Sequence, residues 1–241
     1  MIKTFASTHI GLVRERNEDR YLIKKTDADA FLLVVADGMG GEIAGDFAAE
    51  ILMETMKRFE PNLYDHEQYL SQLVKEADRA IRNEVKKDPE LEGMGTTVTG
   101  MLLNKHMASW VHVGDSRLYL LRRGELVQIT TDQNWAQFLV EEGEITAEEA
   151  RHHVLSNVLD QCVGSGECAP ETGHIDVQHA DLLMLSTDGL HGELPEETIS
   201  NILTFQTDIE TRVKSLIQSA LDTGGKDKEV SHTVESAMRG I

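Results

Sequence analysis

The sequence has few basic residues and no long apolar run. Its 241 residues include 23 lysines and arginines against 42 aspartates and glutamates, which gives a formal net charge of −19. Such a charge repels nucleic acids and anionic lipids and argues against both as general partners. No stretch approaches the roughly 20 apolar residues that span a bilayer, and the first residues lack the apolar segment of a signal peptide. We therefore expect a soluble, cytoplasmic protein that binds neither nucleic acid nor membrane.

Cysteine is equally scarce. The two cysteines, Cys162 and Cys168, show no CxxC spacing and have no histidine pair at zinc-finger spacing. This pattern excludes a disulfide-rich scaffold and a zinc finger, and it predicts free thiols. A chain of 241 residues with 40% hydrophobic content can bury one large core. We expect a single domain over residues 1–241.

Strand-like and helix-like patterns follow one another along the chain. Apolar runs predict strands at about residues 13–25, 31–36, 97–103, 107–113, 118–122, 126–129, 174–177 and 182–186. Apolar residues at helical spacing predict helices at about residues 47–59, 65–87, 195–204 and 208–221. The short turns between residues 97 and 129 predict an antiparallel meander. Antiparallel sheet covered by helices is an α+β layering.

The segment from about residue 131 to residue 170 interrupts this series of predicted strands and helices. It is charged and helical in pattern, with the spacing of a capping box from Thr146 to Glu149. It also carries a basic cluster at residues 151–153. We interpret the segment as an insertion over the edge of the sheet.

Four separate segments place an aspartate beside glycine or at the end of an apolar run. These aspartates are Asp37, Asp115, Asp188 and Asp227. The first three follow strand-like runs, so their carboxylates would emerge where a sheet ends and the backbone turns. Asp-Gly is also the commonest turn dipeptide, but four such segments favour a shared site. Carboxylates without cysteine or paired histidine ligands favour hard cations such as Mg2+ or Mn2+.

Six motifs in a fixed order cover nearly the whole chain. They are GLVRERNED at residues 11–19, ADGMGG at 36–41, GTT at 95–97, VGDSR at 113–117, STDGL at 186–190 and GGKD at 224–227. This ordered set resembles the metal-dependent protein serine/threonine phosphatases of type 2C, the PPM family, particularly its compact bacterial members. The resemblance implies a sandwich of two antiparallel β-sheets, with a helix pair on each outer face and a metal centre at one end.

The resemblance also implies metal ligands. Asp37 would lie between two ions, and Gly38 would contribute its carbonyl directly or through water. Asp188 and Asp227 would be ligands of the first metal. Asp115 would serve a third, weaker ion, although a turn-capping role is the alternative for this residue.

Further residues of the motifs surround these ligands in the family. Glu18 and Asp19 match an acidic pair that closes the site through metal-bound water. Arg14 matches the arginine that holds the substrate phosphate. The insertion at about residues 131–170 matches the flap beside the cleft, an element thought to influence substrate choice.

The function implied is the hydrolysis of phosphoserine and phosphothreonine in proteins by a hydroxide that bridges two Mn2+ or Mg2+ ions, without a phosphoenzyme. The chemistry fits, because two metal ions lower the pKa of a bridging water and clamp the phosphate. The planar fork of Arg14 matches phosphate oxygens better than a lysine would. The expected partner is a phosphorylated protein substrate, and the phosphatase would oppose a serine/threonine kinase. The expected oligomeric state is a monomer.

Two positions depart from the family pattern and leave alternatives open. Met39 stands where some relatives carry a histidine proposed as general acid, so metal-bound water would have to protonate the leaving group. Lys228 follows Asp227 where the family has asparagine, and its charge would weaken metal binding or contact the phosphate. A catalytically silent domain that binds a phosphorylated partner is therefore an alternative. A hydrolase of small phosphoesters is another, although no glycine-rich phosphate loop is present.

Overall fold

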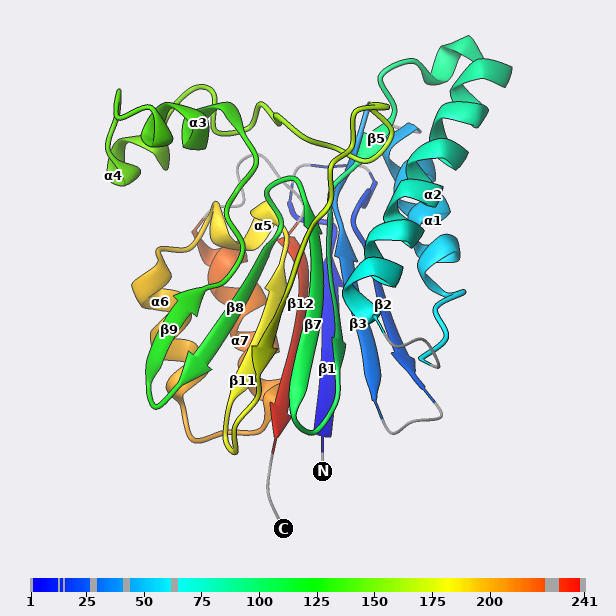
Figure 1. Ribbon diagram of the computed structural model, residues 1–241. Helices are drawn as coiled ribbons and strands as arrows, with labels where there is room; N and C mark the ends of the chain where they lie inside the picture. Colours follow the sequence, from blue (N-terminus) through cyan, green and yellow to red (C-terminus); the bar gives the residue numbers. More distant parts are fainter. Residues whose placement is uncertain are drawn as a thin grey trace.

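Two five-stranded antiparallel sheets face each other, and helices lie on each outer side (Figure 1). The computed structural model describes residues 2–12, 14, 16–26, 30–40, 44–61, 65–223 and 230–238, the last range as backbone alone. The α+β sandwich predicted from the motifs is confirmed. Within these ranges, every helix is too short or too polar to traverse a bilayer.

The strands form two large sheets and one small one. The first sheet has the order β10 (Glu171–Asp176), β7 (Met107–Val113), β6 (Val98–Leu103), β3 (Phe31–Ala36), β2 (Arg20–Lys25). The second has the order β1 (Ile2–His9), β12 (Val230–Met238), β11 (Leu182–Ser186), β8 (Arg117–Arg122), β9 (Glu125–Gln128). The small sheet pairs β4 (Gly38–Met39) with β5 (Gly95–Thr96).

Helices cover the outer faces of both large sheets. On the first sheet lie α1 (Ala44–Met56) and α2 (His66–Lys87), with the short η1 (Pro89–Leu91) after them. On the second lie α5 (Asp188–His191), α6 (Glu196–Thr204) and α7 (Ile209–Asp222). Helix α2 begins at Asp65, whose carboxylate accepts the N–H of Gln68 at 2.9 Å and so caps the first turn.

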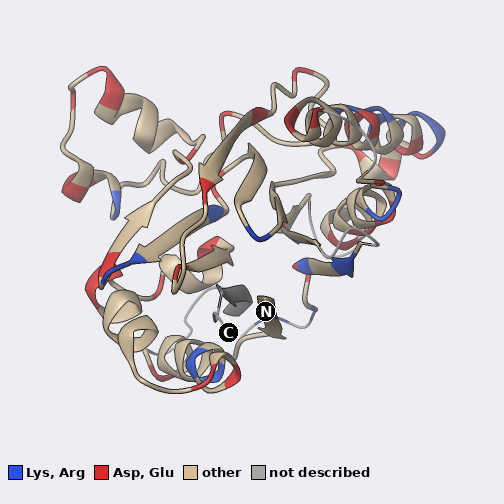
Figure 2. Cartoon of the chain, turned by 60° about the horizontal axis from the view of Figure 1, so that its bottom comes forward, with Lys and Arg blue, Asp and Glu red and all other residues tan. Residues whose placement is uncertain are grey.

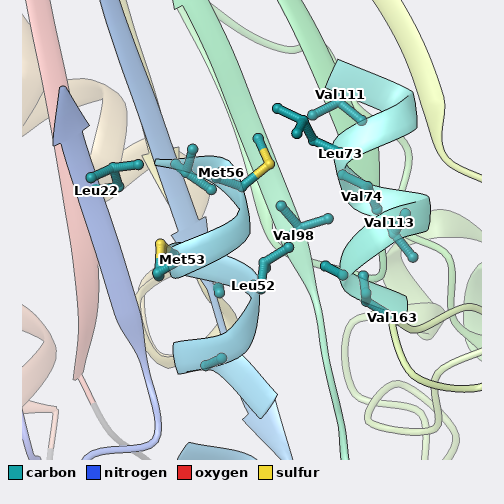
Figure 3. Packing of buried hydrophobic residues seen from close by; sticks show 14 of the residues in the cluster. Leu22, Leu52, Met53, Met56, Leu73, Val74, Val98, Val111, Val113 and Val163 are labelled. Carbon is teal, nitrogen blue, oxygen red and sulfur yellow. The ribbon is translucent and has the colours of Figure 1, made fainter. Parts of the chain in front are cut away.

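Apolar residues on the two faces of each central strand contact different layers. In β3, Leu32 and Val34 pack against the helices, whereas Leu33 and Val35 pack against the opposite sheet. Both faces are buried, which is why the sequence of β3 is an unbroken apolar run. Figure 3 shows the helix side of this packing, where the labelled side chains of α1 and α2 gather over Val98, Val111 and Val113.

The meander predicted for residues 97–129 is wrong as a single unit. Strands β6 and β7 pair in the first sheet, and β8 and β9 pair in the second. The chain crosses between the sheets at residues 114–116, where Gly114 adopts φ +103°. Short connections favour pairing of neighbouring strands, but here the turn carries Asp115 and joins the two layers instead.

The first strand prediction also needs correction. Strand β2 begins at Arg20, not near residue 13, and it is preceded by β1 over Ile2–His9. Before β2, Arg14, Glu18 and Asp19 line the cleft described below. In the 131–170 insertion, α3 (Trp135–Glu141) and α4 (Ala147–Ala150) are short, and the capping box between Thr146 and Glu149 is confirmed.

Candidate active site

A cleft of about 330 Å³ opens at the end of the sandwich where β3, β7 and β11 end. Seven residues singled out in the sequence line it: Arg14, Glu18, Asp19, Asp37, Gly38, Asp115 and Asp188. Met39, Gly40, Thr97, Asn157 and Leu159 complete the lining. Asp227 and Lys228 lie outside the described residues. The structure therefore brings carboxylates from distant motifs into one cavity.

The backbone of Asp37 is fixed by two threonines at and after strand β5. Its N–H donates to Thr97 Oγ1 at 3.0 Å. Its carbonyl accepts the N–H of Thr97 and the hydroxyl of Thr96, each at 2.9 Å. Both polar groups of the main chain are thus satisfied inside the protein. The residue is held so that its carboxylate faces the cleft.

Hydroxyl groups connect the loops that carry the other carboxylates. Thr97 Oγ1 lies 2.7 Å from Ser116 Oγ, which joins the Asp37 turn to the Asp115 turn. Thr187 donates its hydroxyl to Asp19 Oδ2 at 2.8 Å, in a fully buried bond. That bond ties the loop before β2 to the start of α5, where Asp188 is the first residue.

Burial and the neighbouring carboxylates both disfavour the ionised form of Asp37. Burial raises the pKa of the Asp37 carboxyl well above its ordinary value. Negative charge on neighbouring carboxylates raises this pKa further, in decreasing order Asp19, Asp188 and Asp115. Such a cluster is stable at neutral pH when protons or cations neutralise it.

The donor set fits a hydrated divalent cation. Among the described residues, no three histidine, cysteine, aspartate or glutamate side chains form a ready ligand cage. Mg2+ is seldom held in such a cage, because it keeps several waters and uses one or two carboxylates. Oxygen donors alone also suit Mn2+. Asp37 and Asp188, with the Gly38 carbonyl, are the residues that would hold such an ion.

Glycine at position 38 permits close packing behind the cleft. A Cβ atom built there would lie 2.2 Å from the carbonyl oxygen of Gly45 and 2.9 Å from that of Glu18. These are backbone atoms that cannot rotate away. The first turn of α1 therefore touches the strand that follows Asp37, and only glycine fits between them.

Arg14 brings the one guanidinium group to the described lining of the cleft. Its Nη1 donates to Glu18 Oε2 at 3.0 Å. The Arg14 side chain is 44% exposed and that of Glu18 only 7%, so a buried carboxylate orients an accessible cation. A guanidinium has five N–H groups and can bind a second anion at the same time.

Some residues of the cleft carried little signal in the sequence. Thr97 lines the cleft, and its hydroxyl and those of Ser116 and Thr187 join the loops around it, although the sequence motifs gave no sign of these bonds. Asn157 and Leu159 had no signal, because they reach the cleft only through the fold of the 131–170 insertion.

His112 of β7 lies inside the protein. It is buried, and its Nδ1 lies 2.9 Å from Thr99 Oγ1. Burial lowers the pKa of this imidazole. The residue therefore supports the strands behind the cleft and does not line it.

The insertion, which we call the flap, is tied down at both ends. At its start, Asp132 forms two bonds with Arg117, of 2.8 and 2.6 Å. Gln133 exchanges two bonds with the backbone of Gly114, of 2.9 and 2.7 Å. At its end, Val163 pairs with Thr96 through bonds of 2.8 and 3.0 Å. The base of the flap is thus attached to the turn that carries Asp115 and to β5, whose Thr96 bonds to the carbonyl of Asp37.

The fold and the cleft define a class of protein: a helix-flanked antiparallel sandwich with a carboxylate centre at one end. A family model described as protein phosphatase 2C matches residues 11–226. The chain belongs to the protein phosphatase 2C family.

Individual relatives agree with this assignment. Serine/threonine protein phosphatase PstP of Mycobacterium tuberculosis is 36% identical over 229 residues, 94% of this chain and 43% of that protein. The chain therefore spans less than half the length of this relative. Serine/threonine phosphatase stp of Listeria welshimeri is 32% identical over 227 residues, 91% of this chain and 90% of that protein.

A solved structure gives the same result in three dimensions. The catalytic domain of PstP in complex with 2 manganese ions superposes with a TM-score of 0.87 at 34% identity. The match covers 98% of each chain. The predicted family is therefore confirmed by sequence and by fold.

Proposed function

We propose that residues 1–241 form a single catalytic domain that removes phosphate from phosphoserine and phosphothreonine in proteins. The observation that carries this proposal is the cleft itself, in which Arg14 faces a cluster of carboxylates in a member of a phosphatase family. The manganese ions of the PstP structure support Mn2+ or Mg2+ as the cofactor. We further propose that the protein is a cytoplasmic monomer and opposes a serine/threonine kinase.

The metal ligands proposed are Asp37 for two ions, with Gly38, Asp188 and Asp227 around it and Asp115 for a third. When bound, the ions would supply a nucleophile from water at neutral pH and neutralise charge on the phosphoryl group. Asp37 suits the shared position because its carboxylate could offer one oxygen to each ion, and its main chain is held by Thr96 and Thr97. The bond between Asp19 and Thr187 holds a further, buried carboxylate in the lining of the same site.

Arg14 is the residue that would bind the substrate phosphate. Phosphate accepts two parallel N–H bonds from a guanidinium, and this geometry aligns the ester as well as attracting it. Glu18 fixes the guanidinium before substrate arrives, which reduces the entropy lost on binding. Met39 carries no proton to give, so the side chain at that position does not protonate the leaving group.

The proposal is tested by hydrolysis of p-nitrophenyl phosphate with Mn2+, with and without chelator, by the wild type and the Asp188→Ala variant. We expect turnover that the chelator removes and that the variant lacks. A phosphothreonine peptide should be hydrolysed under the same conditions. Folded protein that binds Mn2+ but turns over neither substrate would overturn the proposal and favour a silent phosphate-binding domain.

Replacing Arg14 by alanine should weaken substrate binding without removing the metal. Because a charge-assisted bidentate pair is lost, we expect KM for a phosphopeptide to rise about tenfold or more, at an unchanged Mn2+ affinity measured by calorimetry. The Arg14→Lys variant should recover part of the loss, since lysine keeps the charge but not the fork. An unchanged KM in both variants would remove Arg14 from the substrate site.

A further inference from the structure

Large apolar side chains are exposed on the flap. Trp135 is 43% exposed, Phe138 46% and Val158 43%. The two aromatic rings pack edge to face, with centroids 5.5 Å apart. The N–H of Trp135 donates to the carbonyl of Val158 at 2.9 Å, so the returning chain lies beside the helix. We call Trp135, Phe138 and Val158 the apolar shelf.

The apolar shelf adjoins the cleft. Val158 lies between Asn157 and Leu159, and both of these line the cleft. Leu159 also bridges to Asn134, the residue before Trp135. Among the described residues, no member of the apolar shelf belongs to a hydrophobic core cluster. Its apolar surface therefore does not serve the packing of the sandwich.

The apolar shelf has a fixed position. The bonds of Asp132 and Gln133 at one end of the flap, and of Val163 at the other, hold its base to the walls of the cleft. Within the flap, Asn134 caps α3 by accepting the N–H of Gln137 at 2.9 Å. A preorganised surface beside a binding cleft loses little entropy when a partner covers it.

The surroundings of the apolar shelf are acidic, as the run of acidic positions along the flap in Figure 2 shows. Five exposed glutamates follow Phe138 within the flap: Glu141, Glu142, Glu144, Glu148 and Glu149. The single flap arginine, Arg151, pairs with Glu196 of α6 at 3.0 Å. The basic cluster seen in the sequence therefore does not offset this charge. An apolar surface with an acidic rim complements an apolar segment that carries lysine or arginine.

We propose that the apolar shelf binds the part of the substrate next to its phosphorylated residue, and that this part carries a large aliphatic or aromatic residue together with lysine or arginine. The inference rests on the proposed phosphatase function and specifies the class of phosphoprotein it acts on. A second copy of the chain suits the surface less well, because two chains with a net charge of −19 repel each other.

The test compares the wild type with the Trp135→Ala/Phe138→Ala double variant. The substrates are p-nitrophenyl phosphate and three phosphothreonine peptides, flanked on both sides by leucine and lysine, by serine and lysine, or by leucine and glutamate. We expect kcat/KM for the leucine–lysine peptide to fall about tenfold or more in the variant. Activity on p-nitrophenyl phosphate and on the serine–lysine peptide should not change, and the wild type should hydrolyse the leucine–glutamate peptide more slowly than the leucine–lysine peptide.

Phe205→Ala is the matched control, because Phe205 is 55% exposed at the end of α6 and lies outside the flap. This variant should behave as the wild type on every substrate. Equal losses on all four substrates in the double variant, or no loss on any, would overturn the proposal. So would a wild-type dimer that the double variant breaks, as measured by sedimentation, because a second copy would then be the occupant.

A binding measurement separates this inference from the function on which it rests. Fluorescence polarisation of the labelled leucine–lysine peptide, in chelator, needs no turnover. If the double variant binds this peptide more weakly than the wild type, the proposed role of the apolar shelf in substrate binding is supported even when hydrolysis fails. Equal binding by the two proteins would overturn that role. Loss of turnover alone overturns the proposed activity.

Discussion

Replacing Asp37 by asparagine is expected to abolish phosphatase activity and, at the same time, to raise the thermal stability of the metal-free protein. Activity should fall by more than the roughly 100-fold typical of partners that only support metal ligands. Stability should rise because the carboxylate is buried among other carboxylates, which raises its pKa. The change thus removes a charge that the folded state tolerates poorly without a cation.

The sign of the pH dependence follows from that raised pKa. The folded protein holds the Asp37 proton more tightly than the unfolded chain, so ionisation of Asp37 destabilises the fold as pH rises. The gain in melting temperature of Asp37→Asn should therefore be absent below the ordinary aspartate pKa of about 3.9. The gain in melting temperature should grow as pH rises from that value to the pKa of Asp37 in the folded protein, and it should stay constant above that pKa. Scanning calorimetry in chelator across this range measures it.

A second buried aspartate gives the matched control. Asp181 is 2% exposed and forms two bonds with Arg122, of 2.9 and 2.6 Å. Asp181→Asn should lower the melting temperature, since it leaves a guanidinium without its ionic partner. Added Mn2+ should stabilise the wild type more than Asp37→Asn, because binding to the folded state adds to stability. A lower melting temperature for Asp37→Asn in chelator at neutral pH would contradict the electrostatic account.

Replacing Gly45 by alanine should destabilise the protein, although alanine normally favours a helix over glycine by about 1 kcal/mol. A Cβ at this position would lie 2.7 Å from the carbonyl carbon of Gly38 and 2.8 Å from the N atom of Met39. Both are backbone atoms, so α1 must move away from β4. Overpacking of this kind costs about 1–3 kcal/mol or more, which is several degrees in melting temperature. Activity should fall too, because Gly38 follows Asp37.

The control for this change is Gly124→Ala in the turn between β8 and β9. Gly124 has φ +86°, and its surroundings leave open space within 4 Å of the place that a Cβ would take. Alanine there meets backbone strain without a clash. That variant should lose about 1–2 kcal/mol of stability and keep full activity. If Gly45→Ala proved as stable and as active as the wild type, the close contact between α1 and β4 would be refuted.

The sequence predicted those parts of the fold in which local pattern and tertiary packing agree. Strands β3 and β11 are apolar on both faces because each is covered by helices on one side and by a sheet on the other. Helix α2 has a clear apolar stripe and an Asp65 cap, and its predicted bounds nearly match its actual ones. Asp37 and Asp188 were found because each closely follows such a strand.

Other parts depend on contacts between distant segments and left no local signal. The turn at residues 114–116 joins two sheets, but its length and composition would equally suit a hairpin. Strand β1 mixes apolar and polar residues on both faces, so its pattern was weak. Leu159 reaches the cleft only because it pairs with Asn134, a pairing that the sequence does not predict.

The position of β12 bears on how the protein is made. This strand lies between β1 and β11, and among the described strands it alone joins β1 to the second sheet. A growing chain therefore carries β1 without its sheet partner until residues 230–238 have been synthesised, while the first sheet and its helices can already assemble. The second sheet is complete only when residues 230–238 have been synthesised. Assembly of the second sheet thus depends on a long-range pairing, and a chain that stops before this strand should accumulate with the edges of β1 and β11 exposed.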